Sequence, residues 1–228
     1  MNQIYIGFDP KESIAFHTLS HSILRHSSKP IAVIPINLAN LSDCYHRGSD
    51  DRQSNEFSFS RFLVPYLSGY MGHAIYMDCD MLVTTDMSKL FDQLAETNKA
   101  VHVVKHDYKS STKVKYLGQE QFNYPRKNWS SFVYWNCEHP RNSILTTDKI
   151  RDASAAYLHR FKWLDNEQIG ELDPTWNFLV GEYEQSLELP KVLHWTLGGP
   201  YFNDFSSADY ADLWNREKEL ALNCVQWK

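Results

Sequence analysis

Two aspartates, Asp78 and Asp80, stand two residues apart in the segment IYMDCDMLV. Side chains of an extended segment alternate between faces, so residues two apart point the same way. An apolar run leads into the pair, which places it at the carboxyl end of a buried strand, where open α/β sheets bind ligands. Both carboxylates could therefore reach one hard cation. The alternative is a polar strand end that caps a turn.

Histidines supply the other candidates for chemistry. His106 and Asp107 follow the apolar run VHVV, and their side chains could orient an acceptor hydroxyl or take its proton. An ordinary solvated loop is the alternative for that pair. His17 and His21 have a spacing that suits zinc, but Thr18 stands where the H-E-x-x-H pattern needs a glutamate. We therefore expect these two histidines to serve packing or the helix surface.

The elements that must position these residues alternate between strand and helix in the first half of the chain. Apolar runs predict strands at 3–9, 31–38, 73–83, 101–106, 131–136 and 191–196. Helical periodicity predicts helices at 12–27, 58–67, 90–96, 148–161 and 208–222. The ranges 42–55 and 107–128 are predicted loops, and Pro35 indicates an edge strand. This alternation predicts an α/β fold with a Rossmann-like, mainly parallel mixed sheet flanked by helices.

Composition excludes several classes of protein. The chain has 228 residues, of which 43% are hydrophobic and 22% charged, as in globular proteins. A net charge of -5 argues against nucleic acid as a partner. No apolar run approaches the ~20 residues of a membrane span, and the first residues do not resemble a signal peptide. The 4 cysteines are far apart, so we expect free thiols and a cytoplasmic protein. Neither G-x-G-x-x-G nor a P-loop motif is present.

Three motifs in order resemble glycosyltransferase family 8. The segment FSFSRFLVPYLSGYMGHAIYMDCDMLVTTDMSKLFD resembles the donor-site core of that family, in which an arginine-bearing helix leads to a strand ending in D-x-D. IYIGFD resembles the first strand and nucleotide-contacting turn, and HWTLGGPYF the late H-x-x-G-x-x-K-P-W segment. The resemblance covers about residues 4–205. It implies a single domain of the GT-A type over 1–228, with a nucleotide-sugar-binding half (1–100) and an acceptor-binding half (101–228).

The resemblance also implies the ligands of a cation. By position, Asp78, Asp80 and His194 match the residues that hold Mn²⁺ in the family. Two carboxylates and an imidazole favour Mn²⁺ over Ca²⁺, with Mg²⁺ as an alternative. Asp9 is also predicted to cap the helix that follows it, with Pro10 and Glu12 completing a capping box. The residues implied to contact the nucleotide are Gly7, Phe8, Asp9, Arg61 and Cys79.

Departures from the family concern the diphosphate and the reacting sugar. Pro200 stands where the family has lysine, so the backbone N–H groups of Gly198 and Gly199 are predicted to hold the diphosphate. Lys127 or Lys191 is the alternative for that role. The family's D-Q-D segment corresponds loosely to LDNEQIG, which makes two further residues candidates beside the anomeric carbon: Asp165 and Gln168.

The sequence therefore predicts a metal-dependent glycosyltransferase. It would move a sugar from a nucleotide donor, UDP-linked by resemblance, to a saccharide or another hydroxyl acceptor during glycan or polysaccharide assembly. The alternatives are a sugar-1-phosphate nucleotidyltransferase and a non-catalytic carbohydrate-binding protein. A nucleotidyltransferase should carry a glycine-rich basic loop after its first strand, and IGFDPKES has one glycine there.

Overall fold

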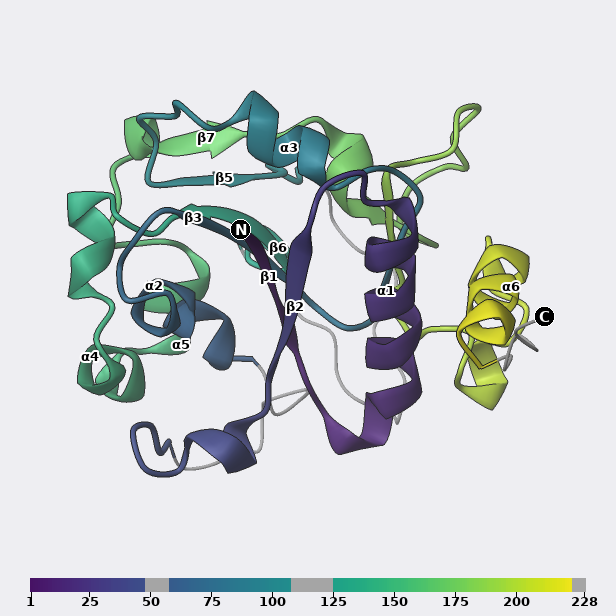
Figure 1. The fold of residues 1–228 in the computed structure, drawn as a ribbon, viewed down its shortest axis with the longest axis horizontal. Helices are drawn as coiled ribbons and strands as arrows, with labels where there is room; N and C mark the ends of the chain where they lie inside the picture. The colour runs from purple at the N-terminus through teal and green to yellow at the C-terminus, as the bar shows by residue number, and fades with distance from the viewer. Residues whose placement is uncertain (48–57, 108–124, 223–228) are drawn as a thin grey trace.

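A six-stranded sheet forms the centre of the protein. The computed structural model describes residues 1–47, 58–107 and 125–222. The strand order is β2-β1-β3-β6-β5-β7, with β6 antiparallel to both of its neighbours and the other pairs parallel. The predicted mainly parallel mixed sheet is therefore confirmed (Figure 1). The strands are β1 (Asn2–Gly7), β2 (Ile31–Ile36), β3 (His73–Met77), β5 (Val101–Val103), β6 (Phe132–Asn136) and β7 (Ile169–Glu171).

A second sheet of three strands lies beside the first. It has the order β4-β9-β8, in which β4 (Met81–Val83) is antiparallel to β9 (Val192–His194) and β8 (Phe178–Leu179) is parallel to β9. The predicted strand at 73–83 is therefore wrong as one element. It breaks at the two aspartates into β3 of the large sheet and β4 of the small one. The chain thus passes from one sheet to the other at Asp78 and Asp80.

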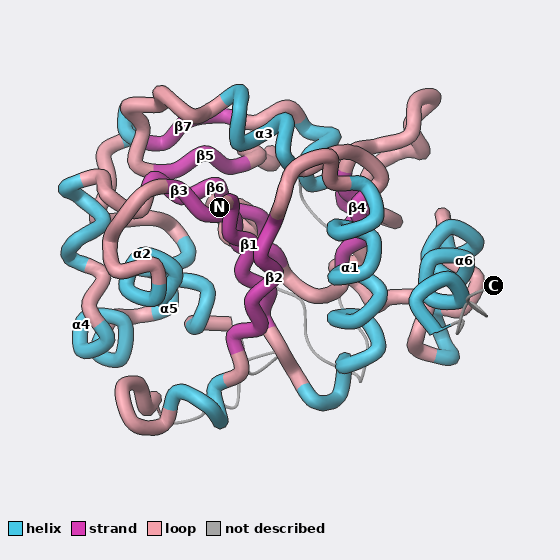
Figure 2. Tube along the Cα trace, viewed as in Figure 1, coloured by secondary structure: helices cyan, strands magenta, loops and turns pink. Residues whose placement is uncertain are grey.

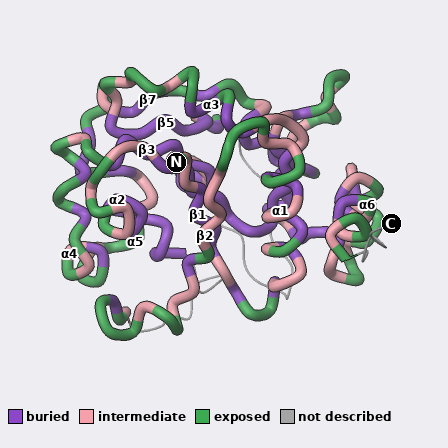
Figure 3. The backbone as a smooth tube through the Cα atoms, in the orientation of Figure 1, coloured by how far each residue is buried: buried purple, intermediate pink, exposed green. Residues whose placement is uncertain are grey.

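The alternation of strand side chains divides the core between the two faces of the large sheet. Tyr5 and Tyr76 face one side, while Ile4, Ile75 and Met77 face the other. Because both faces are covered, the strands other than the edge strand β2 are buried along most of their length (Figure 3). Helix α1 (Ser13–His26) and α3 (Ser88–Gln93) contribute to the second side, and the first is covered by three short helices: α2 (Val64–Leu67), α4 (Thr147–Asp152) and α5 (Ala155–His159).

The helices differ from the predicted ones in two places. The predicted helix 148–161 is two helices, because Ala153 leaves the helical conformation and Ser154 caps α5. The predicted helix 58–67 begins as a 3-10 turn, Ser60–Leu63, and continues as α2. The last helix, α6 (Ala211–Leu222), packs against α1 (Figure 2).

Other expectations about the fold have mixed outcomes. Pro35 lies on β2, an edge strand, as predicted. The sequence does not predict the short strands β7 and β8; β5 and β9 are as short as β7, but they lie within the longer predicted runs 101–106 and 191–196. The predicted loops 42–55 and 107–128 lie partly outside the described residues. Within the described ranges, no helix combines the length and the apolar character needed to cross a membrane.

Candidate metal and donor site

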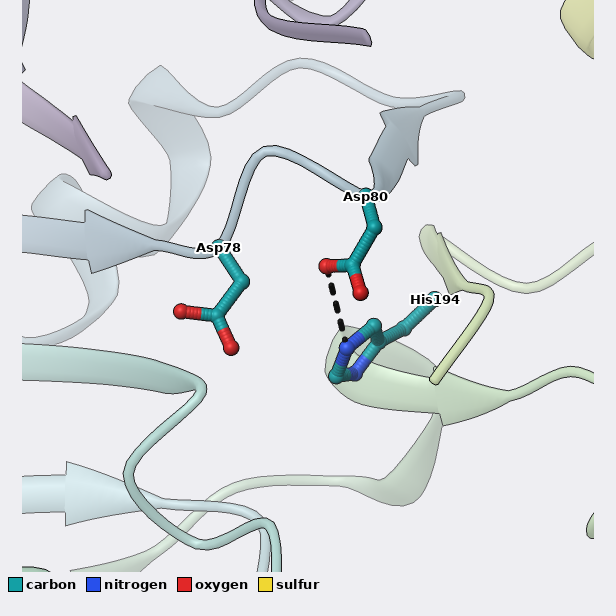
Figure 4. A group of neighbouring side chains, drawn as sticks. All are labelled: Asp78, Asp80 and His194. Carbon is teal, nitrogen blue, oxygen red and sulfur yellow. Dashed lines mark ion pairs between the residues drawn. The ribbon is translucent and has the colours of Figure 1, made fainter. Parts of the chain in front are cut away.

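Asp78, Asp80 and His194 come together at the junction of the two sheets. One potential ligand atom from each lies within 4.8 Å of the other two, and all three residues are buried. The Oδ1 atom of Asp80 is 3.2 Å from Nε2 of His194. Figure 4 shows the two carboxylates and the imidazole directed into one space. The predicted convergence of these residues is therefore confirmed.

The register of the small sheet explains why the histidine reaches the aspartates. Strands β4 and β9 pair so that Met81 lies opposite His194, and the Trp195 N–H donates to the Asp80 carbonyl at 3.0 Å. The two-residue spacing predicts that Asp78 and Asp80 share a face of one extended strand, and this prediction is wrong. The two residues converge because the chain bends between β3 and β4.

The donor atoms at this junction fit a divalent cation. Asp80 Oδ1 is buried and accepts no hydrogen bond from any described residue, and the histidine is its neighbour of opposite charge when protonated. Burial of an unsatisfied carboxylate oxygen is costly unless a positive charge compensates it. Two carboxylate oxygens and one imidazole nitrogen form a ligand set that suits a divalent cation such as Mn²⁺.

Arg61 supplies the permanent positive charge of the site. Its Nη2 is 2.9 Å from Asp78 Oδ1, and its Nη1 donates to the carbonyl of Ser130 at 3.0 Å. The hydroxyl of Tyr76 also donates to Asp78 Oδ1, at 2.8 Å. Burial raises the pKa of Asp78, and the charge of Arg61 opposes that effect. Arg61 thus neutralises an acidic neighbour, one of the two roles predicted for it.

Asn177 and His106 link His194 to Tyr183 through side-chain hydrogen bonds. Asn177 Oδ1 accepts a hydrogen bond from His194 Nδ1 at 2.8 Å, and its Nδ2 donates to His106 Nε2 at 3.0 Å. The other ring nitrogen of His106 is 2.6 Å from the Tyr183 hydroxyl. Burial lowers the pKa of His106 to about 3. Both ring nitrogens of His106 thus contact neighbouring side chains, and Asp107 is exposed at the end of a described range; a catalytic role for either residue stays a prediction.

The turn after β1 contains the predicted nucleotide-contacting residues. Gly7 ends β1, and Phe8 packs edge-on against Phe16 with ring centroids 5.4 Å apart. Asp9 caps the following 3-10 turn, since its Oδ1 accepts from the Lys11 N–H at 2.9 Å. The predicted cap by Asp9 is confirmed, whereas a capping box completed by Glu12 and contact of Asp9 with a nucleotide stay predictions.

A second link joins this turn to the segment after His194. The Tyr201 hydroxyl donates to the buried carboxylate of Glu12 at 2.5 Å. The sequence predicts Glu12 only as a capping residue and misses this tertiary role. The sequence separation of 189 residues explains why no local pattern could reveal it.

The two glycines after His194 are required by neighbouring rings. A Cβ on Gly198, whose φ is +148°, would lie 2.5 Å from the Phe205 ring, and one on Gly199 would lie 2.2 Å from the Tyr201 ring. The N–H of Gly198 donates to the Trp195 carbonyl. That group is therefore already bonded, which corrects its predicted role as a diphosphate donor.

Three other predicted site residues do not join the cluster. The Cys79 side chain is fully buried in the apolar core, and burial raises the pKa of its thiol, which argues against a ribose contact. Gln168 lies beside Ala100 at the start of β5, whereas the site is at the other end of that strand. Asp165 is exposed and pairs with Arg141. The parallel pairing of β5 and β7 thus places Asp165 and Gln168 near the amino-terminal ends of these strands, whereas the site lies near their carboxyl ends.

Comparisons with known proteins place this geometry in context. No family model matches the chain. Protein CDI of Arabidopsis thaliana is 41% identical over 223 residues, which are 95% of this chain and 86% of CDI. The chain belongs to the CDI family. The match covers nearly the whole of this chain and is therefore not confined to the site.

Solved structures identify the fold as GT-A. The bifunctional glycosyltransferase WbbM superposes with a TM-score of 0.65 at 14% identity, covering 95% of this chain and 49% of WbbM. The chain thus spans about half the length of WbbM. The galactosyltransferase LgtC, solved with donor and acceptor sugar analogues, superposes with a TM-score of 0.56 at 10% identity, covering 98% of each chain. The predicted GT-A fold is confirmed, and membership of family 8 stays a prediction.

Proposed function

We propose that this protein is a metal-dependent glycosyltransferase that uses a nucleotide-diphosphate sugar, with UDP as the expected nucleotide. The observation that supports this most directly is the buried Asp78, Asp80 and His194 cluster at the sheet junction of a GT-A fold. LgtC, a structural neighbour, was solved with donor and acceptor sugar analogues. A saccharide hydroxyl is the proposed acceptor, in glycan or polysaccharide assembly.

The residues of the cluster have distinct proposed roles. Asp78, Asp80 and His194 would hold Mn²⁺ or Mg²⁺. The cation, when bound, would neutralise the charge that develops on the leaving nucleoside diphosphate. Arg61 would orient Asp78 through its 2.9 Å contact, and its charge opposes the rise in the pKa of Asp78 that burial causes. The turn at Gly7, Phe8 and Asp9 would contact the nucleoside, because it lies at the carboxyl end of β1, where α/β sheets bind ligands.

The same proposal assigns a different role to each half of the chain. Residues 1–100 would bind the nucleotide sugar, and residues 101–228 would supply the acceptor site and His194. The fold mixes these parts, because β6 and β5 of the second half pair next to β3 of the first. The two halves thus form one sheet, in which the acceptor would approach from the β5 and β6 side.

A nucleotide-release assay tests the proposal. Purified protein with UDP-glucose, UDP-galactose or UDP-xylose should release UDP with Mn²⁺ present and not with a chelator. Asp80→Asn should abolish the release, and Asp212→Asn, the same change at an exposed position of α6, should leave it unchanged. Equal release under chelation would contradict the metal-dependent proposal. Pyrophosphate release from UTP and a sugar 1-phosphate would instead indicate a nucleotidyltransferase.

Ligand binding gives an independent measurement. A ligand at 100 times its Kd stabilises the folded state by about 2.7 kcal/mol, which corresponds to a rise of about 5–10 °C in Tm for a chain of this size. We expect such a rise with UDP and Mn²⁺ together, and its loss in Asp80→Asn. Binding of free saccharides without nucleotide or metal would favour the carbohydrate-binding alternative.

A further inference from the structure

A line of hydrogen bonds runs away from the metal site through three buried side chains. It begins at His194 Nδ1, passes through the carboxamide of Asn177 and the ring of His106, and ends at the Tyr183 hydroxyl. The three distances are 2.8, 3.0 and 2.6 Å. Asn177 is fully buried, and His106 and His194 are nearly so. Asn177 stands immediately before β8, whose pairing with β9 places it beside His194.

The carboxamide determines which nitrogen of His194 carries the proton. Asn177 Oδ1 can only accept a hydrogen bond, so the Nδ1 atom of His194 must donate to it. In the neutral ring, the lone pair then lies on Nε2, the atom that is 3.2 Å from Asp80 Oδ1. Nε2 is thus the nitrogen available to a metal.

The orientation of the carboxamide is itself fixed from the other side. Asn177 Nδ2 donates to His106 Nε2 and, at 2.9 Å, to the Ser131 hydroxyl oxygen. Because His106 accepts at Nε2, its Nδ1 donates to Tyr183. Asn177 Nδ2 also donates to the carbonyl oxygen of Asn128 at 3.4 Å. A carbonyl oxygen can only accept, so a reversed carboxamide would bring two acceptor oxygens together, and Asn128 thereby fixes the observed orientation.

We propose that Asn177, whose carboxamide is oriented by the Asn128 carbonyl, is a positioning residue that holds His194 in its Nδ1–H tautomer and so raises the affinity of the site for a divalent cation. The inference rests on the proposed function, which places a cation at Asp78, Asp80 and His194. Groups that orient a ligating histidine typically change metal affinity by about 10–100-fold.

Titration of the intact protein with Mn²⁺, followed by electron paramagnetic resonance of the free ion, measures that affinity. Asn177→Leu should weaken Mn²⁺ binding by about 10–100-fold. Asn177→Asp should stay within about threefold of the parent or bind more tightly, because a carboxylate also accepts from His194 Nδ1. Ser131→Ala removes another bond of the same carboxamide and should also leave the affinity close to that of the parent. Unchanged affinity in Asn177→Leu, or equal weakening in Asn177→Asp, would overturn the proposal.

A second measurement needs no metal. Nitrogen-15 NMR of the imidazole rings, with His194 assigned by comparison with His194→Gln, reports which nitrogen is protonated. We expect the Nδ1–H tautomer in the parent protein and a shift toward Nε2–H in Asn177→Leu, which lacks the acceptor for Nδ1–H. An unchanged His194 tautomer in Asn177→Leu would overturn the role of Asn177. A parent protein with the expected tautomer and no Mn²⁺ binding would count against the proposed function and not against the tautomer control.

Discussion

Removal of the Arg61 side chain should destabilise the protein strongly, because Asp78 would keep a buried charge without its partner. The side chains of Arg61 and Asp78 are 8% and 10% exposed, and their contact is 2.9 Å. Breaking a buried pair by removing one partner costs about 3–5 kcal/mol. At about 2–4 °C per kcal/mol for a chain of this size, Arg61→Met should lower Tm by about 6–20 °C.

A double-mutant cycle separates this electrostatic effect from lost packing. Thermal unfolding is measured in chelator for the parent, Arg61→Met, Asp78→Asn and the double variant. The double variant should be more stable than Arg61→Met, since a neutral carboxamide in place of the Asp78 carboxylate removes the unpaired charge and still accepts from Tyr76. Arg151→Met is the matched control: its contact with Asp148 is shorter, 2.6 Å, but both side chains are exposed, so Tm should stay unchanged. An Arg61→Met variant as stable as the parent, or one that Asp78→Asn fails to rescue, would refute the reasoning.

Two further predictions concern packing and pH. Gly170→Ala should cost about 1–3 kcal/mol in urea denaturation, because its Cβ would lie 2.2 Å from His102 Nδ1. Glu217→Gln should cost about 1–3 kcal/mol near pH 7, between the values for exposed and buried ion pairs. Burial disfavours ionisation of Glu217, but hydrogen bonds from Arg25 and His21 lower its pKa below the usual 4.5. Its carboxylate therefore stabilises the fold above about pH 4.5, and the difference between parent and variant should shrink as the pH falls through the lowered pKa.

The predictions for Gly170→Ala and Glu217→Gln each have their own control experiment. For Gly170, the His102→Ala change in the same chain should reduce the cost of the added methyl group, and full additivity of the two substitutions would contradict a steric cause. For Glu217, urea denaturation from about pH 3 to about pH 8 is compared between parent and variant, a range that extends below and above the usual pKa of 4.5. A stability difference that widens on acidification would show that the carboxylate does not stabilise the fold in this way.

Local patterns of the chain were enough to predict the central strands and their burial. The runs that became β1, β2, β3 and β6 are apolar and bounded by turn residues. Predictions failed where elements are short or where a break has a tertiary cause. The strand predicted at 73–83 has an apolar pattern on both sides of the aspartates, yet β3 belongs to the six-stranded sheet and β4 to the three-stranded sheet. No local signal in the sequence distinguishes one continuous strand from two strands in different sheets, because the partner of β4 is β9, which is far away in the sequence.

The same contrast holds for the candidate site. Tyr76 could have been found, because it precedes Asp78 by two residues and such residues share a face of a strand. Asn177 could not, because one asparagine after a tryptophan has no pattern that distinguishes a buried carboxamide from a surface one. The prediction that Asp165 and Gln168 lie beside the site failed because the resemblance there is loose. The parallel pairing of β7 with β5 decides at which end of the strands these residues lie.

The amino-acid sequence alone was enough to establish the alternation of apolar strands and helices, the two aspartates at the end of the third strand, and the order of motifs that includes His194. The folded chain was needed to show that these three side chains meet, that Arg61 pairs with Asp78, and that Asn177 contacts His194. The two kinds of information differ in the sequence separation of the residues that they relate. Periodicity records which face of a local element is buried, whereas the meeting of side chains depends on the register between strands far apart in the chain.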